Sequence, residues 1–325
     1  MSNQNKTIFL FPGQGSQYVG MSKELAEKFN NCTKIKQIHE CGSDILGYNL
    51  KELLYNSDDA KLANTLYSQP AIFAASLVCL AALEESGSIY TAGVDGSAGH
   101  SLGEYAALVN CGAFNLETAF KLIKNRAEII AKAGENSSGA MAAVIGMSAE
   151  DVKEVCEEIS NFGSYVTLAN HNSPTQCVIS GEITAIEKAE ELLKSKPVKR
   201  LKFIRLKVSA AFHSKLMQTA ADEFEATIKD YAFAKPTGAF YSNRTGCILA
   251  DDEFTNLPSY LANHITGSVL FVDQLMAMQK DGFDTFVEIG PGKVLSGLIN
   301  KTLKDVNVFN VEDVASLEKL SEFVK

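Results

Sequence analysis

The strongest constraint on the fold is a run of alternating strand and helix patterns between residues 136 and 204. In chain order it comprises a strand over 139–146, a helix over 148–160, strands over 165–170 and 176–180, a helix over 182–194 and a strand over 200–208. The order β-α-β-β-α-β is the ferredoxin-like motif, and a length of about 65 residues suits one small domain. We therefore predict a small ferredoxin-like domain inserted at 136–204.

The parts of the chain on either side of this insertion have the pattern of one larger α/β domain. Thr7–Phe11 is a short β-rich run that stops at Pro12-Gly13, where a glycine-rich turn begins. Helical spacing follows over 18–29, 68–85 and 116–133. A chain of 325 residues is long enough for two packing units. We predict a discontinuous domain of residues 1–135 plus 205–325.

Composition excludes several classes of protein. The net charge of −9 argues against broad binding to nucleic acid or to an anionic membrane, because both need a positive field. The seven cysteines are scattered, and none has the C-x-x-C spacing of a zinc or redox site. The first six residues are polar, with no signal-peptide pattern, and the longest apolar stretch, 71–83, is shorter than the ~20 residues of a membrane helix. We expect a soluble, cytoplasmic protein.

A candidate nucleophile lies at Gly99-His-Ser-Leu-Gly103. The pentapeptide fits G-x-S-x-G, in which glycine two residues to either side lets the backbone turn sharply around the serine. The helical pattern of Glu104–Leu108 follows directly, so the hydroxyl of Ser101 would lie at a helix N-terminus that stabilises negative charge. A chance glycine-serine turn is the alternative, and the strand that should precede it, at Asp95-Gly96-Ser97, is a poor β-former.

The five histidines provide one favoured candidate for the base that a serine nucleophile needs. His39 lies in a polar helix and is expected on the surface, whereas His171 is expected in a solvated loop. His264 could end a helix, and His100 is adjacent to the serine on a turn where neighbours usually point apart. His213 follows a strand and precedes a helix, the position that faces the ligand crevice of α/β folds. We therefore predict that His213 is the base.

The same residues belong to a longer series of motifs. The chain resembles the malonyl-CoA:acyl-carrier-protein transacylases and the related acyltransferases of polyketide synthases, in segments that follow the family's order over nearly the whole chain. The matching segments are Phe11-Pro-Gly-Gln-Gly-Ser-Gln17, Gly99-His-Ser-Leu-Gly-Glu-Tyr105, Arg126, Gly139–Gly146, Asn172-Ser-Pro174, Val178-Ile-Ser-Gly181, Ser209-Ala-Ala-Phe-His-Ser214, Tyr241-Ser-Asn243 and Val287–Leu295.

The resemblance implies a role for each matching site residue. Ser101 would be the nucleophile and His213 its general base. The backbone N–H groups of Gln14 and Leu102 would form the oxyanion hole. Arg126 would bind the free carboxylate of malonate through its planar guanidinium, and His100 would line the site.

The resemblance also implies the architecture and the partners. It predicts an α/β-hydrolase-like large domain carrying the ferredoxin-like insertion, with the acyl site between them. A backbone carbonyl, not an aspartate, would orient the histidine, although the segment that supplies it, Gly267–Phe271, departs from the usual Pro-Val-(Gln/Arg)-Trp. The substrates would be malonyl-CoA and the phosphopantetheine of acyl carrier protein, with no metal and no bound cofactor. We expect a monomer.

Three further features each have two possible interpretations. Phe212 precedes His213 as in the form of the motif associated with malonyl selectivity, although core packing is the alternative. Gly290-Pro-Gly-Lys293 lacks the P-loop spacing, so a tight turn below the site is favoured. A basic run over 194–207 is either the charged face of an edge strand or a docking surface for carrier protein or coenzyme A phosphates.

Several alternatives of function stay open. The enzyme could supply fatty-acid synthesis, which we favour, or a polyketide synthase, because the motifs serve both. A serine hydrolase would use water as acceptor, but an α/β-hydrolase normally has its histidine late in the chain, and His213 precedes about a third of this one. An inactive carrier-binding module would not need both Ser101 and His213.

Overall fold

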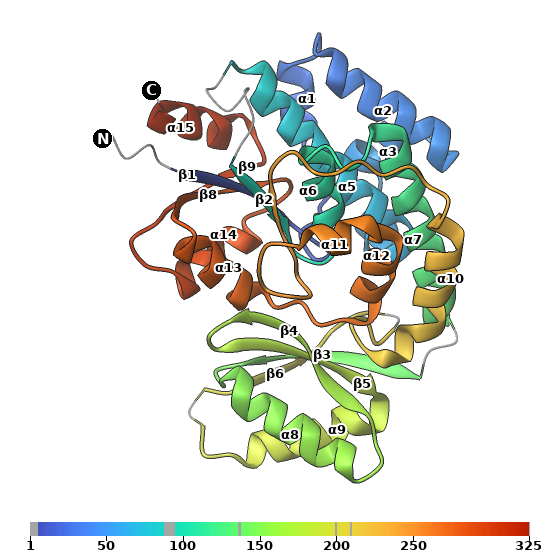
Figure 1. Cartoon of the computed structure of the whole chain (residues 1–325), viewed down its shortest axis with the longest axis vertical. Coiled ribbons are helices and arrows are strands. Elements are labelled where there is room, and N and C mark those ends of the chain that lie inside the picture. The colour runs from blue at the N-terminus through green and yellow to red at the C-terminus, as the bar shows by residue number, and fades with distance from the viewer. Residues whose placement is uncertain (1–5, 88–94, 136–137, 199, 209, 325) are drawn as a thin grey trace.

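The computed structural model describes residues 6–87, 95–135, 138–198, 200–208 and 210–324. Lys199 of the basic run and Ser209 of the histidine motif lie outside the described residues. Two sheets organise these residues: a five-stranded parallel sheet inside the larger, upper part of the molecule in Figure 1, and a four-stranded antiparallel sheet in the smaller part below it. The predicted α/β class is therefore confirmed.

The parallel sheet has the strand order β7-β2-β1-β8-β9. Its strands are β1 (Lys6–Phe11), β2 (Gly96–Gly99), β7 (Ala239–Tyr241), β8 (Phe283–Ile289) and β9 (Asn307–Val311). β2 has only four residues and little β propensity, but it pairs with β1 on one side and β7 on the other. Pairing on both edges gives its backbone N–H and C=O groups hydrogen-bond partners. This explains why a strand forms where the local sequence disfavours one.

Helices cover both faces of this sheet (Figure 1). In chain order they are α1 (Lys23–Lys28), α2 (Thr33–Leu46), α3 (Leu50–Asn56), α4 (Asp59–Ala63), α5 (Thr65–Glu85), α6 (Gly103–Asn110), α7 (Leu116–Glu135), the 3₁₀ turn η2 (Lys215–Met217), α10 (Gln218–Ile228), α11 (Asp251–Thr255), α12 (Leu257–Thr266), α13 (Phe271–Lys280), α14 (Val294–Thr302) and α15 (Val314–Val324).

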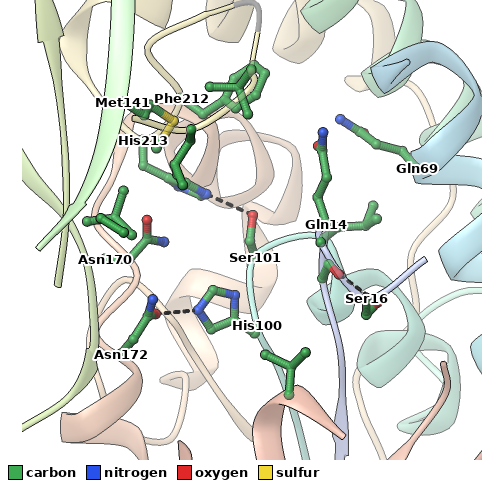
Figure 2. A pocket seen from close by; sticks show the side chains of 18 of the residues that line it. Gln14, Ser16, Gln69, His100, Ser101, Met141, Asn170, Asn172, Phe212 and His213 are labelled. Atoms are coloured by element: carbon green, nitrogen blue, oxygen red, sulfur yellow. Dashed lines mark hydrogen bonds between the residues drawn. The ribbon is translucent and has the colours of Figure 1, made fainter. Parts of the chain in front are cut away.

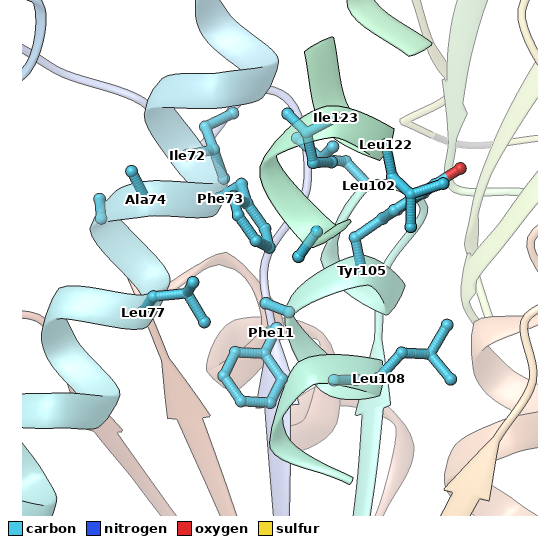
Figure 3. Close-up of a cluster of buried hydrophobic side chains, with 14 of the residues drawn as sticks. Phe11, Ile72, Phe73, Ala74, Leu77, Leu102, Tyr105, Leu108, Leu122 and Ile123 are labelled. Carbon is cyan, nitrogen blue, oxygen red and sulfur yellow. The ribbon is translucent and has the colours of Figure 1, made fainter. Parts of the chain in front are cut away.

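Helix α5 forms the centre of the larger core. It is apolar on all sides, and its Phe73 packs against Phe120 of α7 at a ring distance of 5.2 Å. Figure 3 shows α5 beside Phe11 of β1 and Tyr105 of α6, which places this core directly behind the serine turn. Among the described residues α5 is the one helix long and apolar enough to cross a membrane by length and composition, yet 89% of that window is buried. That burial is the pattern of a core helix.

The antiparallel sheet has the order β4-β5-β3-β6. Its elements are β3 (Gly139–Ile145), α8 (Ala149–Asn161), β4 (Val166–Ser173), β5 (Gln176–Glu182), α9 (Ile183–Ser195) and β6 (Lys202–Arg205). Both helices pack on one face and share one apolar cluster with the strands (Figure 1). The predicted succession of strands and helices is confirmed.

Two contacts join the antiparallel sheet to the larger core beside the site. Asn170 of β4 forms an isolated bridge with Val269, and the Ser268 hydroxyl donates to the Leu168 carbonyl at 2.7 Å. The expectation of a loop from His171 onward was wrong, because β4 continues to Ser173. The His171 N–H donates to the Val269 carbonyl at 2.9 Å, a pairing with a segment about a hundred residues away that local sequence does not reveal.

Two other expectations were also wrong. The helix predicted over 18–29 is described only from Lys23, since Gly20 and Ser22 adopt positive φ angles of 90° and 61° that interrupt it. His39 is not on the surface: its side chain is buried, and Nε2 lies 2.9 Å from the hydroxyl of Tyr55. Burial lowers the pKa of His39 to about 4, so the ring is neutral.

Candidate active site

Ser101 lies in the sharp turn between β2 and α6. Its φ angle is 51°, a left-handed conformation that is unfavourable for a residue with a Cβ. The flanking glycines are required by close packing: a Cβ on Gly99 would collide with the backbone of Gly103 and Glu104, and one on Gly103 with the carbonyl of Phe11. The turn thus presents the serine side chain at the start of α6, as the sequence predicts.

The structure brings Ser101 and His213 together. The serine Oγ lies 2.7 Å from Nε2 of His213, as Figure 2 shows. Nδ1 of the same ring lies 2.9 Å from the carbonyl oxygen of Gly267. Because a carbonyl can only accept, the proton resides on Nδ1 and leaves Nε2 free to accept from the serine hydroxyl. The carbonyl comes from the segment whose sequence departs from the usual one, so the backbone group survives the side-chain changes.

The environment of His213 keeps the ring neutral. Its side chain is buried, and Arg126 and His100 add repulsion toward a second positive charge. Burial first, and these charges second, lower the pKa of His213 to about 3. A neutral imidazole is the form that can take a proton, so the ring is available as a base throughout the neutral pH range.

Arg126 lies on α7, buried, at the wall of the same cavity. Its Nη1 donates to Oε1 of Gln69 at 2.6 Å, and the guanidinium lies 5.5 Å from the ring centre of Tyr105. Within the described residues its Nε has no hydrogen-bond partner and no carboxylate forms an ion pair with it. A buried cation in this state is costly unless an anion binds to it. The guanidinium is therefore free to bind an anion that enters the cavity.

Gln14 and Leu102 both line the cavity beside the serine, one in the turn after β1 and the other at the start of α6. Among the described residues, neither backbone N–H donates to a protein acceptor. A Cβ on Gly13 would collide with the carbonyl of His100, and Gly15 has a φ angle of 104°. The two glycines thus allow the Gln14 turn to approach the serine turn closely. Their arrangement is suited to an oxyanion hole.

His100 lies on the opposite side of the serine from His213 (Figure 2). Its Nε2 is 2.7 Å from Oδ1 of Asn172 on β4, and its ring packs edge-on against Phe271 at 5.4 Å. Burial lowers its pKa. The residue lines the cavity, as predicted, and ties the serine turn to the antiparallel sheet.

The cavity of about 500 Å³ lies between the two sheets. The antiparallel sheet contributes Met141, Ala143 and Val178 to its wall, and Phe212 lies near Met141 in Figure 2. Lys207 and Val294 are exposed residues that also line it. Within the described ranges, no group of three or more His, Cys, Asp or Glu side chains could hold a metal ion.

Some residues of the site were not assigned a role from sequence. Gln69 contacts Arg126 and is one of the few polar residues buried on α5, so its long amide side chain next to the apolar stretch 71–83 was the available signal. Met141, Asn172 and Asn243 lie within matched motifs, but nothing in their local sequence indicates what they contact. The turn at Gly290 packs against Pro12 and Ser76 below the site, in agreement with a supporting turn.

The parallel α/β sheet and the arrangement around Ser101 are those of an acyl-transfer enzyme. The chain belongs to the acyl transferase domain family, whose model matches residues 8–322. It is 36% identical over 321 residues to the malonyl CoA-acyl carrier protein transacylase of Bacillus subtilis, with 99% of this chain and 98% of that protein covered.

Solved structures agree with this assignment. The malonyl CoA-acyl carrier protein transacylase of Clostridium perfringens is 40% identical, with a TM-score of 0.90 over 98% of this chain and 97% of that one. A type II PKS acyl-carrier protein in complex with its malonyl-transacylase matches with a TM-score of 0.90, 32% identity and coverage of 98% and 99%.

Proposed function

We propose that the protein transfers the malonyl group of malonyl-CoA to the phosphopantetheine thiol of acyl carrier protein, through an ester on Ser101. The observation that carries the proposal is the presence, in one buried cavity, of the Ser101–His213 hydrogen bond and a guanidinium without an anionic partner. The similarity to malonyl CoA-acyl carrier protein transacylases over almost the full chain supports it.

In the first half-reaction, Nε2 of His213 takes the proton of the serine hydroxyl while Oγ attacks the thioester carbonyl. The resulting oxyanion is bound by the N–H groups of Gln14 and Leu102. The carbonyl of Gly267 accepts from Nδ1 and steadies the imidazolium. When the tetrahedral intermediate collapses, the C–S bond breaks, the imidazolium returns its proton to the thiolate, and coenzyme A leaves.

The second half-reaction reverses these roles with a different thiol. His213 takes the proton of the phosphopantetheine thiol, the sulfur attacks the malonyl-serine ester, and Ser101 leaves with the proton from the imidazolium. Arg126 holds the terminal carboxylate through both steps, which fixes the acyl carbonyl near the serine. The kinetics are ping-pong because one donor product leaves before the acceptor reacts.

We further propose the finer architecture and setting. Residues 136–204 form a ferredoxin-like domain inserted into an α/β-hydrolase-like domain of residues 1–135 and 205–325. The antiparallel order β4-β5-β3-β6 with two helices on one face supports the first assignment. We also propose that the protein is cytoplasmic and monomeric, with no metal or bound cofactor. Phe212, at the cavity wall, would crowd an α-methyl group and favour malonyl over methylmalonyl donors.

The pathway has two candidates. Supply of fatty-acid synthesis is the principal one. Supply of a polyketide synthase is favoured by one observation, the likeness to a malonyl-transacylase bound to a type II PKS acyl-carrier protein. Comparing malonyl transfer to carrier proteins of both kinds distinguishes them. Use of water as acceptor, the hydrolase alternative, would appear as release of free malonate.

The function is tested by intact-protein mass after brief mixing with malonyl-CoA, in parallel with acetyl-CoA and methylmalonyl-CoA. We expect one malonyl adduct, mapped to Ser101 by peptide sequencing and discharged by added holo acyl carrier protein. An adduct that discharges only to water would indicate the hydrolase. Absence of any adduct from the three donors would refute the serine ester.

The basic run contributes differently along its length. Arg205 of β6 lies 3.5 Å from both Glu187 and Glu190 of α9, so this part is an edge strand with paired charges. Lys207 instead is exposed, forms no ion pair within the described residues and lines the cavity. We propose that Lys207 contacts the acidic carrier protein or the phosphates near the thiol arm.

We expect Lys207→Glu to raise the KM for carrier protein about tenfold at low salt and to weaken its salt dependence, since a rim charge mainly steers association. Steady-state rates at several salt concentrations measure this effect. Lys319→Glu, on the exposed face of α15, is the matched control. A KM equal to that of the control would leave the basic run with only its edge-strand role.

A further inference from the structure

We propose that Asn243 is a positioning residue that holds Ser101 and His213 at bonding distance by contacting both of their supporting segments at once. The proposal rests on the proposed function for its chemistry. Asn243 lies in the turn after β7, its side chain is fully buried, and it is not among the residues that line the cavity. It therefore acts through other residues and does not touch substrate.

On the serine side, the side-chain amide bridges the turn. Oδ1 accepts from the N–H of Ser101 at 2.6 Å, and Nδ2 donates to the carbonyl of Gly99 at 2.6 Å. These two backbone groups lie on either side of His100 and lead into Ser101, the left-handed residue, whose φ angle is 51°. A left-handed conformation persists only where surrounding contacts impose it. The amide of Asn243 supplies two such contacts, both on the backbone that enters the nucleophile from its N-terminal side.

On the histidine side, the backbone of the same residue holds the segment that orients the ring. The carbonyl of Asn243 accepts from the N–H of Leu270 at 2.8 Å. Three residues earlier in that segment, the carbonyl of Gly267 accepts from Nδ1 of His213 at 2.9 Å. One buried residue thus links the serine turn to the segment whose Gly267 carbonyl orients the imidazole ring of His213.

The orientation of the amide is itself determined. Nδ2 also donates to Oε1 of Gln274 at 3.0 Å, and Nε2 of Gln274 donates to the carbonyl of Tyr241 at 2.8 Å. The backbone N–H of Asn243 donates to Oε1 of Glu104, the residue three positions after the nucleophile. A flipped amide would direct N–H groups at the Ser101 N–H and an oxygen at the Gly99 carbonyl, so one orientation is required.

The consequence of this network is a specific loss of rate. Without the amide, the serine hydroxyl loses its fixed distance to Nε2, whereas the wall around Arg126 stays in place. A displacement of about 1 Å at a reacting group costs on the order of 100-fold in rate. Binding of malonyl-CoA depends on other residues and should change little.

The test compares Asn243→Ala with wild type in two single-turnover reactions: malonylation by malonyl-CoA, and phosphonylation of Ser101 by a fluorophosphonate. We expect both rates to fall about 100-fold, while the half-saturating malonyl-CoA concentration changes less than about threefold. Asn110→Ala is the matched control, since it also removes a side-chain bond next to β2, from Asn110 Nδ2 to Ser97 Oγ. That control should label at the wild-type rate with a similar melting temperature.

Other outcomes are equally decisive. A folded Asn243→Ala protein that labels within about threefold of wild type overturns the proposal. If this variant does not fold, Gln274→Met decides, because it keeps Asn243 and removes the bond that orients its amide, together with the bond to the Tyr241 carbonyl; about tenfold slower labelling is expected, and an unchanged rate is contrary to the proposal. Fluorophosphonate labelling needs no acyl donor, so it still tests Asn243 if malonyl-CoA is not the substrate.

Discussion

Replacing His213 with alanine is expected to lower the rate of both half-reactions by at least about 10⁴-fold, the loss typical of a missing triad base. The reason is that, in the proposed mechanism, the same Nε2 atom, 2.7 Å from Oγ of Ser101, takes the proton in each half-reaction. The buried ring also packs against His264 at a ring distance of 5.6 Å, so melting temperatures are compared alongside and rates are normalised to folded protein. Malonylation and discharge are measured separately, by quenched-flow mass analysis.

The pH dependence of the wild type provides a second measurement on the same residue. A pKa of about 3 means that His213 stays neutral as pH falls from 8 to 5, so the base is present throughout and malonylation should not lose rate in that range. An ordinary histidine, with a pKa near 6.5, would lose most of its base form by pH 5. A rate that falls tenfold for each pH unit below about 6.5 would show that the ring is more hydrated than its burial indicates.

His171→Ala is the control for the His213→Ala substitution. His171 is partly buried on β4, with Nδ1 3.5 Å from Asp273, and it contacts neither the serine nor the cavity. It should retain the wild-type rate. Equal losses in the two variants would mean that packing near the sheet junction, not proton transfer, limits the reaction.

The sequence was informative wherever a local pattern determines the structure. Helix α7 and the two helices of the antiparallel sheet follow the helical hydrophobic period closely, because each buries one face against a neighbour. Strand β2 was uncertain from sequence, since Gly96-Ser-Ala-Gly99 has no intrinsic preference for an extended conformation. It forms because β1 and β7 pair with both of its edges. Its glycines are explained by close packing, because a Cβ on Gly96 or Gly99 would collide with neighbouring atoms.

The residues of the site also differ in whether local sequence or distant contacts determine their position. Ser101 and its glycines form a motif whose geometry is local, so the sharp turn that presents the proposed nucleophile could be predicted. Asn243 could be matched to a motif but not given a role, because its partner Ser101 is 142 residues away and the contact exists only in the folded chain. His39 was misplaced because the polar residues around it suggested an exposed face, whereas its ring turns inward to Tyr55.

Substitution of Arg126 is expected to change which acyl group reacts. The proposed malonyl carboxylate would bind to the edge of the guanidinium that Gln69 leaves unbonded, replacing the cost of a buried unpaired cation with a charged, bidentate contact. Two charge-assisted hydrogen bonds contribute about 3–6 kcal/mol in total, so Arg126→Leu should lower kcat/KM for malonyl-CoA by roughly 10³-fold. Acetyl-CoA has no carboxylate, and its slow reaction should be unchanged or faster.

Arg126→Lys separates charge from geometry. Lysine keeps the positive charge but cannot present two parallel N–H groups, so we expect a loss of about 10²-fold, between the wild type and the leucine variant. Competition between malonyl-CoA and acetyl-CoA, followed by mass analysis of the acyl-enzyme, measures the preference directly and is insensitive to the amount of active protein. Equal losses for both donors in Arg126→Leu would mean that the guanidinium only supports the fold of the cavity. The malonyl carboxylate would then have to bind to another cation on the cavity wall.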